Sequence, residues 1–225
     1  MIPHELLGSA QVPGQGGEMC LYRHDGDFTV RIRGIELMTT REIGSEEMLA
    51  EFALARLPDT ERARVMVGGL GMGYTLARVL DLIGSDGVAE VVELVPEIIE
   101  WNRRWLGDLS RHPLRDERVV VVEGDVHDRI REAKASYDAI LLDVDNGPEG
   151  LVKKGNDALY TMDGLQAAAA ALRPGGVLAI WSMAHYKWFT QRIRAAGFDV
   201  TEERARARRR KGTVRTIWLA TPKAS

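Results

Sequence analysis

The stretch Val65-Met-Val-Gly-Gly-Leu-Gly-Met-Gly73 is the most informative part of this sequence. Its three leading apolar residues predict a short buried strand. The glycines that follow allow the backbone to turn tightly and to approach a ligand where a Cβ atom would collide. A helical pattern begins at Tyr74, and the N-terminus of a helix favours negative charge. We therefore expect a strand, a ligand-binding turn and a helix in direct succession.

Strands and helices continue to alternate after this turn. Apolar strand patterns cover residues 65–67, 88–94, 119–122, 139–142 and 177–181, and helical patterns cover 74–82, 96–106, 126–134, 163–172 and 188–196. Continuous apolar strands separated by helices indicate a parallel sheet covered on both faces, and right-handed crossovers make it doubly wound. Two final strands, over 198–203 and 213–220, form a hairpin and must be antiparallel to each other. The predicted fold class is α/β, a Rossmann-like doubly wound sheet of seven strands.

The N-terminal part of the chain has a different pattern. Short β-like runs cover residues 19–23, 28–33 and 35–40, and Asp25-Gly26 predicts a hairpin turn between the first two. A helix follows from Ser45, its expected N-cap, to about residue 57. We expect the residues before Gly17 to be mobile. The predicted organisation is an N-terminal β-hairpin and helix extension over 1–60 and a Rossmann-like catalytic domain over 61–225.

Composition excludes several classes of protein. Of the 225 residues 45% are hydrophobic and 28% charged, which is ordinary for a globular protein. No apolar run approaches the roughly 20 residues that span a bilayer, and the first residues do not resemble a signal peptide. Cys20 is the single cysteine, so an internal disulfide and a cysteine-based metal site are excluded. We expect a cytoplasmic protein that binds no membrane and, since its histidines are scattered, no metal.

Charge is distributed unevenly along the chain. The net charge is −3, yet residues 204–211 carry six positive charges and no negative one, which leaves −9 for the remainder. Because this run lies between the two predicted final strands, it is interpreted as a solvated hairpin tip. We therefore expect no binding of nucleic acid.

Acidic residues follow the predicted strands at the edge where ligands bind in such sheets. Glu93 ends the second strand, and a carboxylate there can accept hydrogen bonds from both hydroxyl groups of a ribose. Asp125 follows the third strand and can accept from the amino group of an adenine whose ring Val126 covers. The alternative is that Asp125 only caps the next helix.

Two carboxylates and an amide follow the fourth strand, at Asp143, Asp145 and Asn146. Crowding of like charges raises the pKa of a carboxyl group, which suits a general base near neutral pH. The alternative is a loop held by Asx turns. Together, Glu93, Asp125, Asp143 and Asp145 favour the binding of a positively charged nucleoside and of an amine-like acceptor.

The spacing of the glycines favours one nucleoside over others. A dinucleotide fingerprint requires glycines at n, n+2 and n+5, and no choice of n satisfies this here. Gly69, Gly71 and Gly73 have instead the spacing found in proteins that bind S-adenosylmethionine. A tight turn with no ligand remains the alternative.

Residues 20–220 resemble the spermidine synthase family, a branch of the class I S-adenosylmethionine-dependent transferases. The motifs that carry the resemblance are Val65–Gly73, Val91–Leu94, Glu123–Val126, Tyr137–Asp143, Gly147-Pro148, Leu159-Tyr160 and Leu172–Gly176. The resemblance implies that Gly69, Gly71, Gly73, Glu93, Leu94, Asp125, Val126 and Asp143 bind the cofactor. It also implies that Asp143 positions and deprotonates the attacking amine, that Tyr160 lines the substrate pocket, and that the protein is a homodimer.

Several positions depart from the family pattern. Gly71 stands where the family has an aspartate that meets the amine of decarboxylated S-adenosylmethionine, and Asn146 stands where it has a second catalytic aspartate. Asp145 is the alternative to that aspartate, one residue out of register. The family's Tyr-His-Glu is Ser45-Glu46-Glu47 here, and its glutamine falls on Glu36 or Leu37.

These departures determine the order of the functional hypotheses. The sequence favours methyl transfer from S-adenosylmethionine to a small amine-like acceptor, with Asp143, Asp145 and Tyr160 as catalytic residues. The alternative is aminopropyl transfer from decarboxylated S-adenosylmethionine to a polyamine. A third hypothesis is a nucleoside-binding homologue without catalysis.

Overall fold

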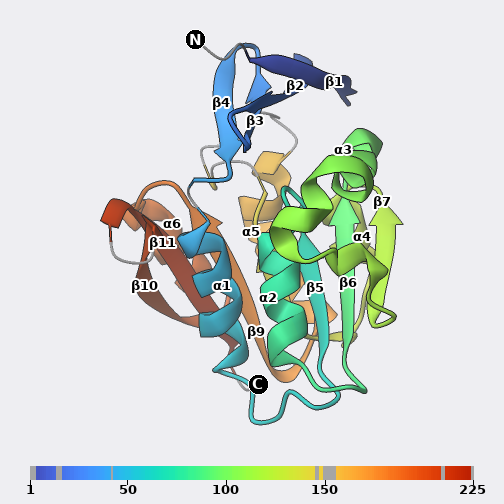
Figure 1. The fold of residues 1–225 in the computed structure, drawn as a ribbon. Helices are drawn as coiled ribbons and strands as arrows, with labels where there is room; N and C mark the ends of the chain where they lie inside the picture. Colours follow the sequence, from blue (N-terminus) through green and yellow to red (C-terminus); the bar gives the residue numbers. More distant parts are fainter. Residues whose placement is uncertain are drawn as a thin grey trace.

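The computed structural model describes residues 4–13, 17–41, 43–144, 147–148, 156–208 and 211–223. These residues form two sheets (Figure 1). A large sheet makes up the lower part of the view, and a small antiparallel sheet lies above the carboxyl ends of its parallel strands. No helix in the described part of the chain is both long enough and apolar enough to cross a membrane.

The large sheet is the predicted doubly wound α/β sheet of seven strands. Its members are β5 (Arg64–Gly68), β6 (Val88–Glu93), β7 (Val119–Glu123), β8 (Tyr137–Leu142), β9 (Leu172–Ser182), β10 (Phe198–Arg208) and β11 (Lys211–Pro222), in the order β10-β11-β9-β8-β5-β6-β7. The strands from β5 to β9 pair in parallel, and β11 lies antiparallel to both β9 and β10. The chain order reverses between β5 and β8, so a ligand crevice is expected there.

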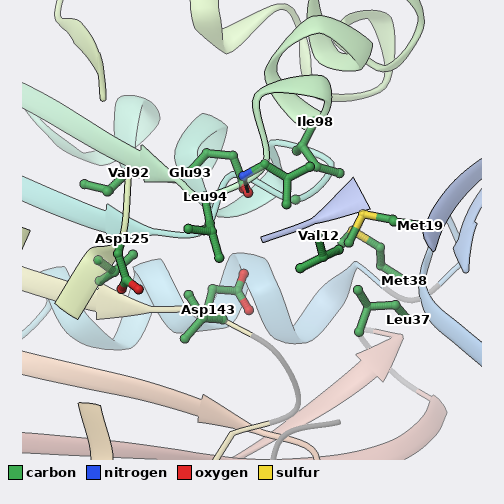
Figure 2. A pocket seen from close by; sticks show the side chains of 15 residues that line it. Val12, Met19, Leu37, Met38, Val92, Glu93, Leu94, Ile98, Asp125 and Asp143 are labelled. Carbon is green, nitrogen blue, oxygen red and sulfur yellow. Dashed lines mark hydrogen bonds between the residues drawn. The ribbon is translucent and has the colours of Figure 1, made fainter. Parts of the chain in front are cut away.

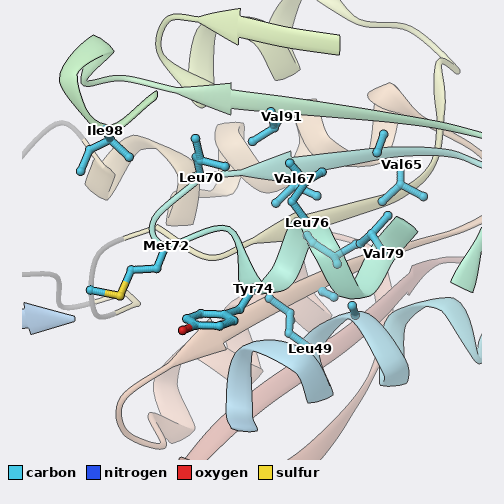
Figure 3. Packing of buried hydrophobic residues seen from close by; sticks show 14 of the residues in the cluster. Leu49, Val65, Val67, Leu70, Met72, Tyr74, Leu76, Val79, Val91 and Ile98 are labelled. Carbon is cyan, nitrogen blue, oxygen red and sulfur yellow. The ribbon is translucent and has the colours of Figure 1, made fainter. Parts of the chain in front are cut away.

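Helices cover both faces of this sheet. They are α1 (Gly44–Leu54), α2 (Tyr74–Leu82), α3 (Pro96–Trp101), α4 (Val126–Glu132), α5 (Met162–Ala171) and α6 (Lys187–Ala195). Figure 3 shows Val65 and Val67 of β5 packed beside Leu76 and Val79 of α2, with Leu49 of α1 on the outer side. This apolar contact fixes the turn between β5 and α2 relative to the sheet.

The small sheet contains one strand more than the sequence predicted. Its strands are β1 (Glu5–Val12), β2 (Gly17–His24), β3 (Asp27–Ile32) and β4 (Ile35–Thr39), paired in that order. The expectation that the residues before Gly17 are mobile is wrong for β1, which pairs along its length with β2. Its weak alternation of apolar and polar residues gives little local signal, so pairing with β2 decides its conformation.

Two predicted boundaries need correction. Helix α1 begins one residue before Ser45, with Ile43 at the cap position, and Ser45 is buried inside the first turn. Strand β10 extends to Arg208, so Arg204, Arg206 and Arg208 are strand residues with exposed side chains and do not form a hairpin tip. The division into units near residue 60 remains a prediction; α1 itself packs against α2 and β10.

Candidate functional site

A pocket lies at the carboxyl ends of β5, β6, β7 and β8, beneath the small sheet. Figure 2 shows its layout, with Asp125 and Val92 at one end, Glu93, Leu94 and Asp143 in the middle, and Val12, Met19, Leu37 and Met38 at the other end. Gly69, Gly71, Val95, Ile98, Val126 and Val144 complete the lining. The pocket thus combines acidic groups that follow β6, β7 and β8 with an apolar wall formed by Val12, Met19, Leu37 and Met38.

The glycine turn forms one side of the pocket. Gly69, Gly71 and Gly73 all have φ between +52° and +86°, the left-handed region that favours glycine. A Cβ atom on Gly69 would lie 2.6 Å from the carbonyl oxygen of Asp143, so this turn can approach β8 only without a side chain. Gly73 precedes α2 and a Cβ atom on it would meet Ser110 Oγ at 2.8 Å. Gly69 and Gly71 line the pocket, and Gly73 does not.

Glu93 is held rigidly at the end of β6. Its side chain is 8% exposed, and its two carboxylate oxygens accept hydrogen bonds from the backbone N–H groups of Leu70 and Val95, both at 2.9 Å. Burial raises the pKa of Glu93, while the backbone N–H donors oppose this shift. Each oxygen keeps a lone pair for a further donor, so the group can receive two ligand hydroxyls.

Asp125 caps a helix and also lines the pocket, so its binding of an adenine remains a prediction. Its Oδ1 accepts a hydrogen bond from the N–H of His127 at 2.9 Å and so caps α4, and its side chain also lines the pocket. Val126 follows in the first turn of α4 and lines the same end. Leu94 lies across the middle of the pocket (Figure 2). This end therefore offers an acceptor beside flat apolar surfaces.

Asp143 occupies the centre of the pocket floor, directly after β8. Its backbone N–H donates to the carbonyl oxygen of Gly68 at 2.9 Å, which ties the end of β8 to the end of β5. Thr75 Oγ1 donates to Asp143 Oδ2 at 2.7 Å. Burial raises the pKa of Asp143 to about 6, against the effect of the Thr75 hydrogen bond. A carboxyl group with this pKa is ionised at neutral pH and can accept a proton.

A second acid lies beside Asp143, and sequence reasoning did not assign it a role. Burial and the charges of Asp143 and Glu47 raise the pKa of Glu46 well above its usual range. Thr75 Oγ1 lies 3.4 Å from the carbonyl oxygen of Glu46, so the start of α1 packs against the start of α2 at this point. The Ser45-Glu46-Glu47 sequence could have pointed to Glu46 as a site residue. It did not, because the proximity of Glu46 to Asp143 arises only in the folded chain.

Of the two other predicted catalytic residues, only Tyr160 lies in the described part of the chain, and it does not line the pocket. Tyr160 is 2% exposed and packs edge to face against Phe189, with ring centroids 5.5 Å apart, in the core beneath α5 and α6. Asp145 lies outside the described residues, as does Asn146. Both assignments therefore remain predictions.

The described residues fit a nucleoside that carries a sulfonium. Glu93 offers a fixed pair of acceptors, Asp125 and Val126 offer an acceptor beside an apolar surface, and Asp143 places a negative charge between them and the small sheet. The glycine turn lets the backbone approach the ligand closely at Gly71, where a Cβ atom would have only Met38 Sδ nearby, at 3.6 Å.

Comparison with known proteins extends this description. Residues 42–195 match the family described as "Spermine/spermidine synthase domain". A polyamine aminopropyltransferase of Mycobacterium tuberculosis is 29% identical over 207 residues, which cover 88% of this chain and 36% of the relative. One from Nitrosomonas europaea is 32% identical over 121 residues, or 53% of this chain and 34% of the relative.

Solved structures agree on the fold. Spermidine synthase from Thermotoga maritima superposes with a TM-score of 0.76 at 21% identity, covering 98% of this chain and 74% of that one. A spermidine synthase in complex with the transition-state analogue AdoDATO gives a TM-score of 0.75, also at 21% identity, over 98% and 73% of the two chains. Both therefore confirm the predicted class I transferase fold with its small N-terminal sheet.

These findings correct the order of the functional hypotheses. The sequence favoured methyl transfer because Gly71 replaces an acid. The matched family, however, is described as a spermine/spermidine synthase domain, and the relatives are named polyamine aminopropyltransferases. The earlier alternative is thus the better supported one, and methyl transfer is wrong as the main hypothesis. The chain spans only 36% of the length of the first of these relatives. Its match over residues 42–195 shows that it belongs to the spermine/spermidine synthase domain family.

Proposed function

We propose that this protein is a transferase that moves the aminopropyl group of decarboxylated S-adenosylmethionine to a small amine. The observation that carries the proposal is the position of Asp143. Its ionisable carboxyl group, with a pKa of about 6, lies between the acceptor groups suited to a nucleoside and the end of the pocket beneath the small sheet. The names of the family and of its curated relatives support the same reaction.

Each group in the pocket has a defined task in this proposal. Glu93 receives the ribose hydroxyls, Asp125 and Val126 hold the adenine, and Leu94 covers the nucleoside. Decarboxylated S-adenosylmethionine supplies a sulfonium, whose sulfur leaves as a neutral thioether. The carboxylate of Asp143 orients the amine and keeps it within reach of the reacting carbon.

The proposed step balances without a metal or a redox partner. The amine nitrogen forms a bond to the aminopropyl carbon, the carbon–sulfur bond breaks, and its electron pair stays on sulfur in 5′-methylthioadenosine. The proton released from nitrogen passes to Asp143 and then to water. A base with a pKa of about 6 is ionised at pH 7 to 8 and is thus ready to accept it.

The test measures release of 5′-methylthioadenosine from decarboxylated S-adenosylmethionine with a panel of amines. We expect turnover by the unmodified protein, and Asp143→Asn should lower kcat by about 100-fold or more because it removes the base. Binding of 5′-methylthioadenosine by Asp143→Asn should change little, which shows that the variant is folded. The protein could instead bind 5′-methylthioadenosine but form none of it from decarboxylated S-adenosylmethionine with any amine. It would then be the homologue without catalysis, and the proposal would fail.

Two broader features belong to the same proposal. We propose that the enzyme acts in the cytoplasm and that it forms a homodimer, as the family resemblance suggests. Light scattering during size-exclusion chromatography measures the mass in solution. A mass equal to the 25.0 kDa of one chain would contradict the dimer.

A further inference from the structure

Thr75 connects the floor of the pocket to the start of α2. It is 2% exposed and is the second residue of that helix. Its Oγ1 donates to Asp143 Oδ2 at 2.7 Å, a short distance that is typical of a hydrogen bond to an ionised carboxylate. The backbone N–H of Asp143 is held separately by the carbonyl oxygen of Gly68. Asp143 is thus fixed at two points, one on β5 and one on α2.

The hydrogen bond from Thr75 distinguishes the two carboxylate oxygens of Asp143. Oδ2 is committed to the α2 side, and α2 itself is fixed on β5 through Leu76 and Val79 (Figure 3). The Asp143 carboxyl group also lies in the middle of the pocket lining (Figure 2). We therefore expect Oδ1 to be the oxygen that faces the amine.

Glu46 of α1 is a second acid near the same hydroxyl group. Thr75 Oγ1 lies 3.4 Å from the backbone carbonyl oxygen of Glu46, which is a much weaker contact than the one to Asp143. A hydroxyl group has a single hydrogen to donate. Of the two acids, the carboxyl group of Asp143 is thus the one that receives it.

The two acids do not lose their protons independently. Burial and the charges of Asp143 and Glu47 raise the pKa of Glu46 well above its usual range. Burial also raises the pKa of Asp143 to about 6, but there the Thr75 hydrogen bond opposes the rise. Interacting acids titrate in two steps, and their surroundings decide which one ionises first. A donor to one carboxylate favours the ionised form of that group.

Other titratable groups come close to this pair from the elements around it. They lie on α1 and α2 and at the ends of β6 and β7, and they are Glu47, Tyr74, Glu93 and Asp125. Each of them is an acid, so its negative charge disfavours a further charge on either member of the pair. Among these described neighbours, the Thr75 hydroxyl is the group that favours the charge on Asp143.

We propose that Thr75 is a positioning residue that makes Asp143, rather than Glu46, the base for the amine. The Thr75 hydroxyl stabilises the charge on Asp143 and directs Oδ1 toward the pocket, while Glu46 keeps its proton. In the reaction, a proton passes from the amine nitrogen to Oδ1, and the electron pair of that N–H bond stays on nitrogen. This inference rests on the proposed function and names the group that selects its base.

The first experiment follows each carboxyl group directly by nuclear magnetic resonance. Protein labelled with carbon-13 in the carboxyl groups of Asp and Glu is titrated, and Asp143→Asn and Glu46→Gln assign the two signals. In the unmodified protein we expect Asp143 to ionise first, near pH 6, and Glu46 at a higher pH. This measurement does not depend on turnover.

Two variants separate the hydroxyl group of Thr75 from the volume of its side chain. Thr75→Val has nearly the same shape without the hydroxyl, and Thr75→Ser keeps the hydroxyl. Thr75→Val should raise the titration midpoint of Asp143 by about one to two pH units, the usual effect of a hydrogen bond to a charged group. Thr75→Ser should return the midpoint toward that of the unmodified protein. The acid limb of the pH profile of kcat/KM should move in the same way.

A matched pair of amide variants tests the division of roles between the two acids. Asp143→Asn removes the base, whereas Glu46→Gln replaces a group that we expect to be protonated already. In release of 5′-methylthioadenosine, kcat should fall by about 100-fold or more in the first variant and by less than about threefold in the second. Binding of 5′-methylthioadenosine checks that each variant keeps a formed pocket.

The outcomes separate this inference from the proposed function. Ionisation of Glu46 before Asp143 in the unmodified protein overturns the inference and leaves aminopropyl transfer standing. A Thr75→Val variant with an unchanged Asp143 midpoint does the same, and so do equal losses of kcat in the two amide variants. If no amine releases 5′-methylthioadenosine, the proposed function fails and the base role fails with it, whichever acid ionises first.

Discussion

At the scale of single residues, the ionised carboxyl group of Asp143 makes the fold less stable. Burial raises its pKa from 3.8 to about 6, so the folded chain holds this proton more tightly than the unfolded chain. The resulting stabilisation is complete below pH 3.8 and is lost as the pH rises through about 6. At neutral pH the carboxylate of Asp143 is therefore charged although its burial disfavours the charge. Such a destabilising charge is expected of a group that is retained for function.

This balance predicts that loss of the charge stabilises the protein. Asp143→Asn keeps an oxygen that accepts from Thr75 and removes the buried charge, so we expect its Tm at pH 8 to exceed that of the unmodified protein. A gain of about 1 kcal/mol corresponds to roughly 2–4 °C for a chain of this size. The gain should disappear near pH 4, where the unmodified side chain is also protonated.

The measurement is thermal unfolding at a series of pH values, with Asp199→Asn as the control. Asp199 lies on β10 with its side chain 81% exposed, so its neutralisation should leave Tm nearly unchanged across the same range. An Asp143→Asn variant less stable than the unmodified protein at pH 8 would show that the carboxylate has a partner that compensates for its burial.

At the scale of elements, a π-helical turn over Asn102–Leu106 continues α3 and supports the glycine turn. Asn102 is 2% exposed, and its Nδ2 donates to the carbonyl oxygens of Gly71 at 2.8 Å and Ile98 at 2.9 Å. The N–H of Leu70 is held from the other side by Glu93. The peptide that approaches the ligand is thus fixed from both directions. Wide helical turns of this kind are frequent at functional sites.

Removal of this support should weaken nucleoside binding. Asn102→Ala deletes the donor and leaves the carbonyl oxygen of Gly71 without that bond, so we expect the Kd for 5′-methylthioadenosine to rise by about tenfold. Ile193→Val, on the buried face of α6, is the control for general destabilisation of about 1 kcal/mol. Equal Kd values for the two variants, measured by calorimetry, would show that Asn102 only stabilises the fold.

Elements also show which features the sequence could reveal. The glycine turn and the acids Glu93, Asp125 and Asp143 were predictable, because parallel strands bring their carboxyl ends to one edge. The π-helical turn was predicted as ordinary helix, since its register depends on the contact of Asn102 with Gly71. The apolar wall was not predicted at all. It requires a bulge at Leu37 and the docking of the small sheet, and neither leaves a local pattern.

At the scale of the whole molecule, the small sheet completes the pocket only because it is docked on the large domain. One contact joins Gly8 of β1 to Trp101 at the end of α3, where a Cβ atom on Gly8 would lie 2.7 Å from Trp101 Nε1. Trp101 is 3% exposed and packs in the same core cluster as Val12 and Met19. The position of the apolar wall relative to Asp143 therefore depends on the absence of a side chain at Gly8.

This dependence predicts that a single methyl group displaces the wall. Gly8→Ala forces the indole of Trp101 or strand β1 to move, because a 2.7 Å contact is shorter than any real Cβ contact allows. We expect KM for the amine acceptor to rise about threefold to tenfold. The Kd for 5′-methylthioadenosine, which we propose to be set by Glu93 and Asp125, should change little. Ser9→Ala, at the adjacent exposed position of β1, is the control and should alter neither value. If Gly8→Ala weakens the binding of the acceptor and of the nucleoside equally, the prediction is wrong. The small sheet and the nucleoside end of the pocket would then move together, and the position of the small sheet would not affect acceptor binding selectively.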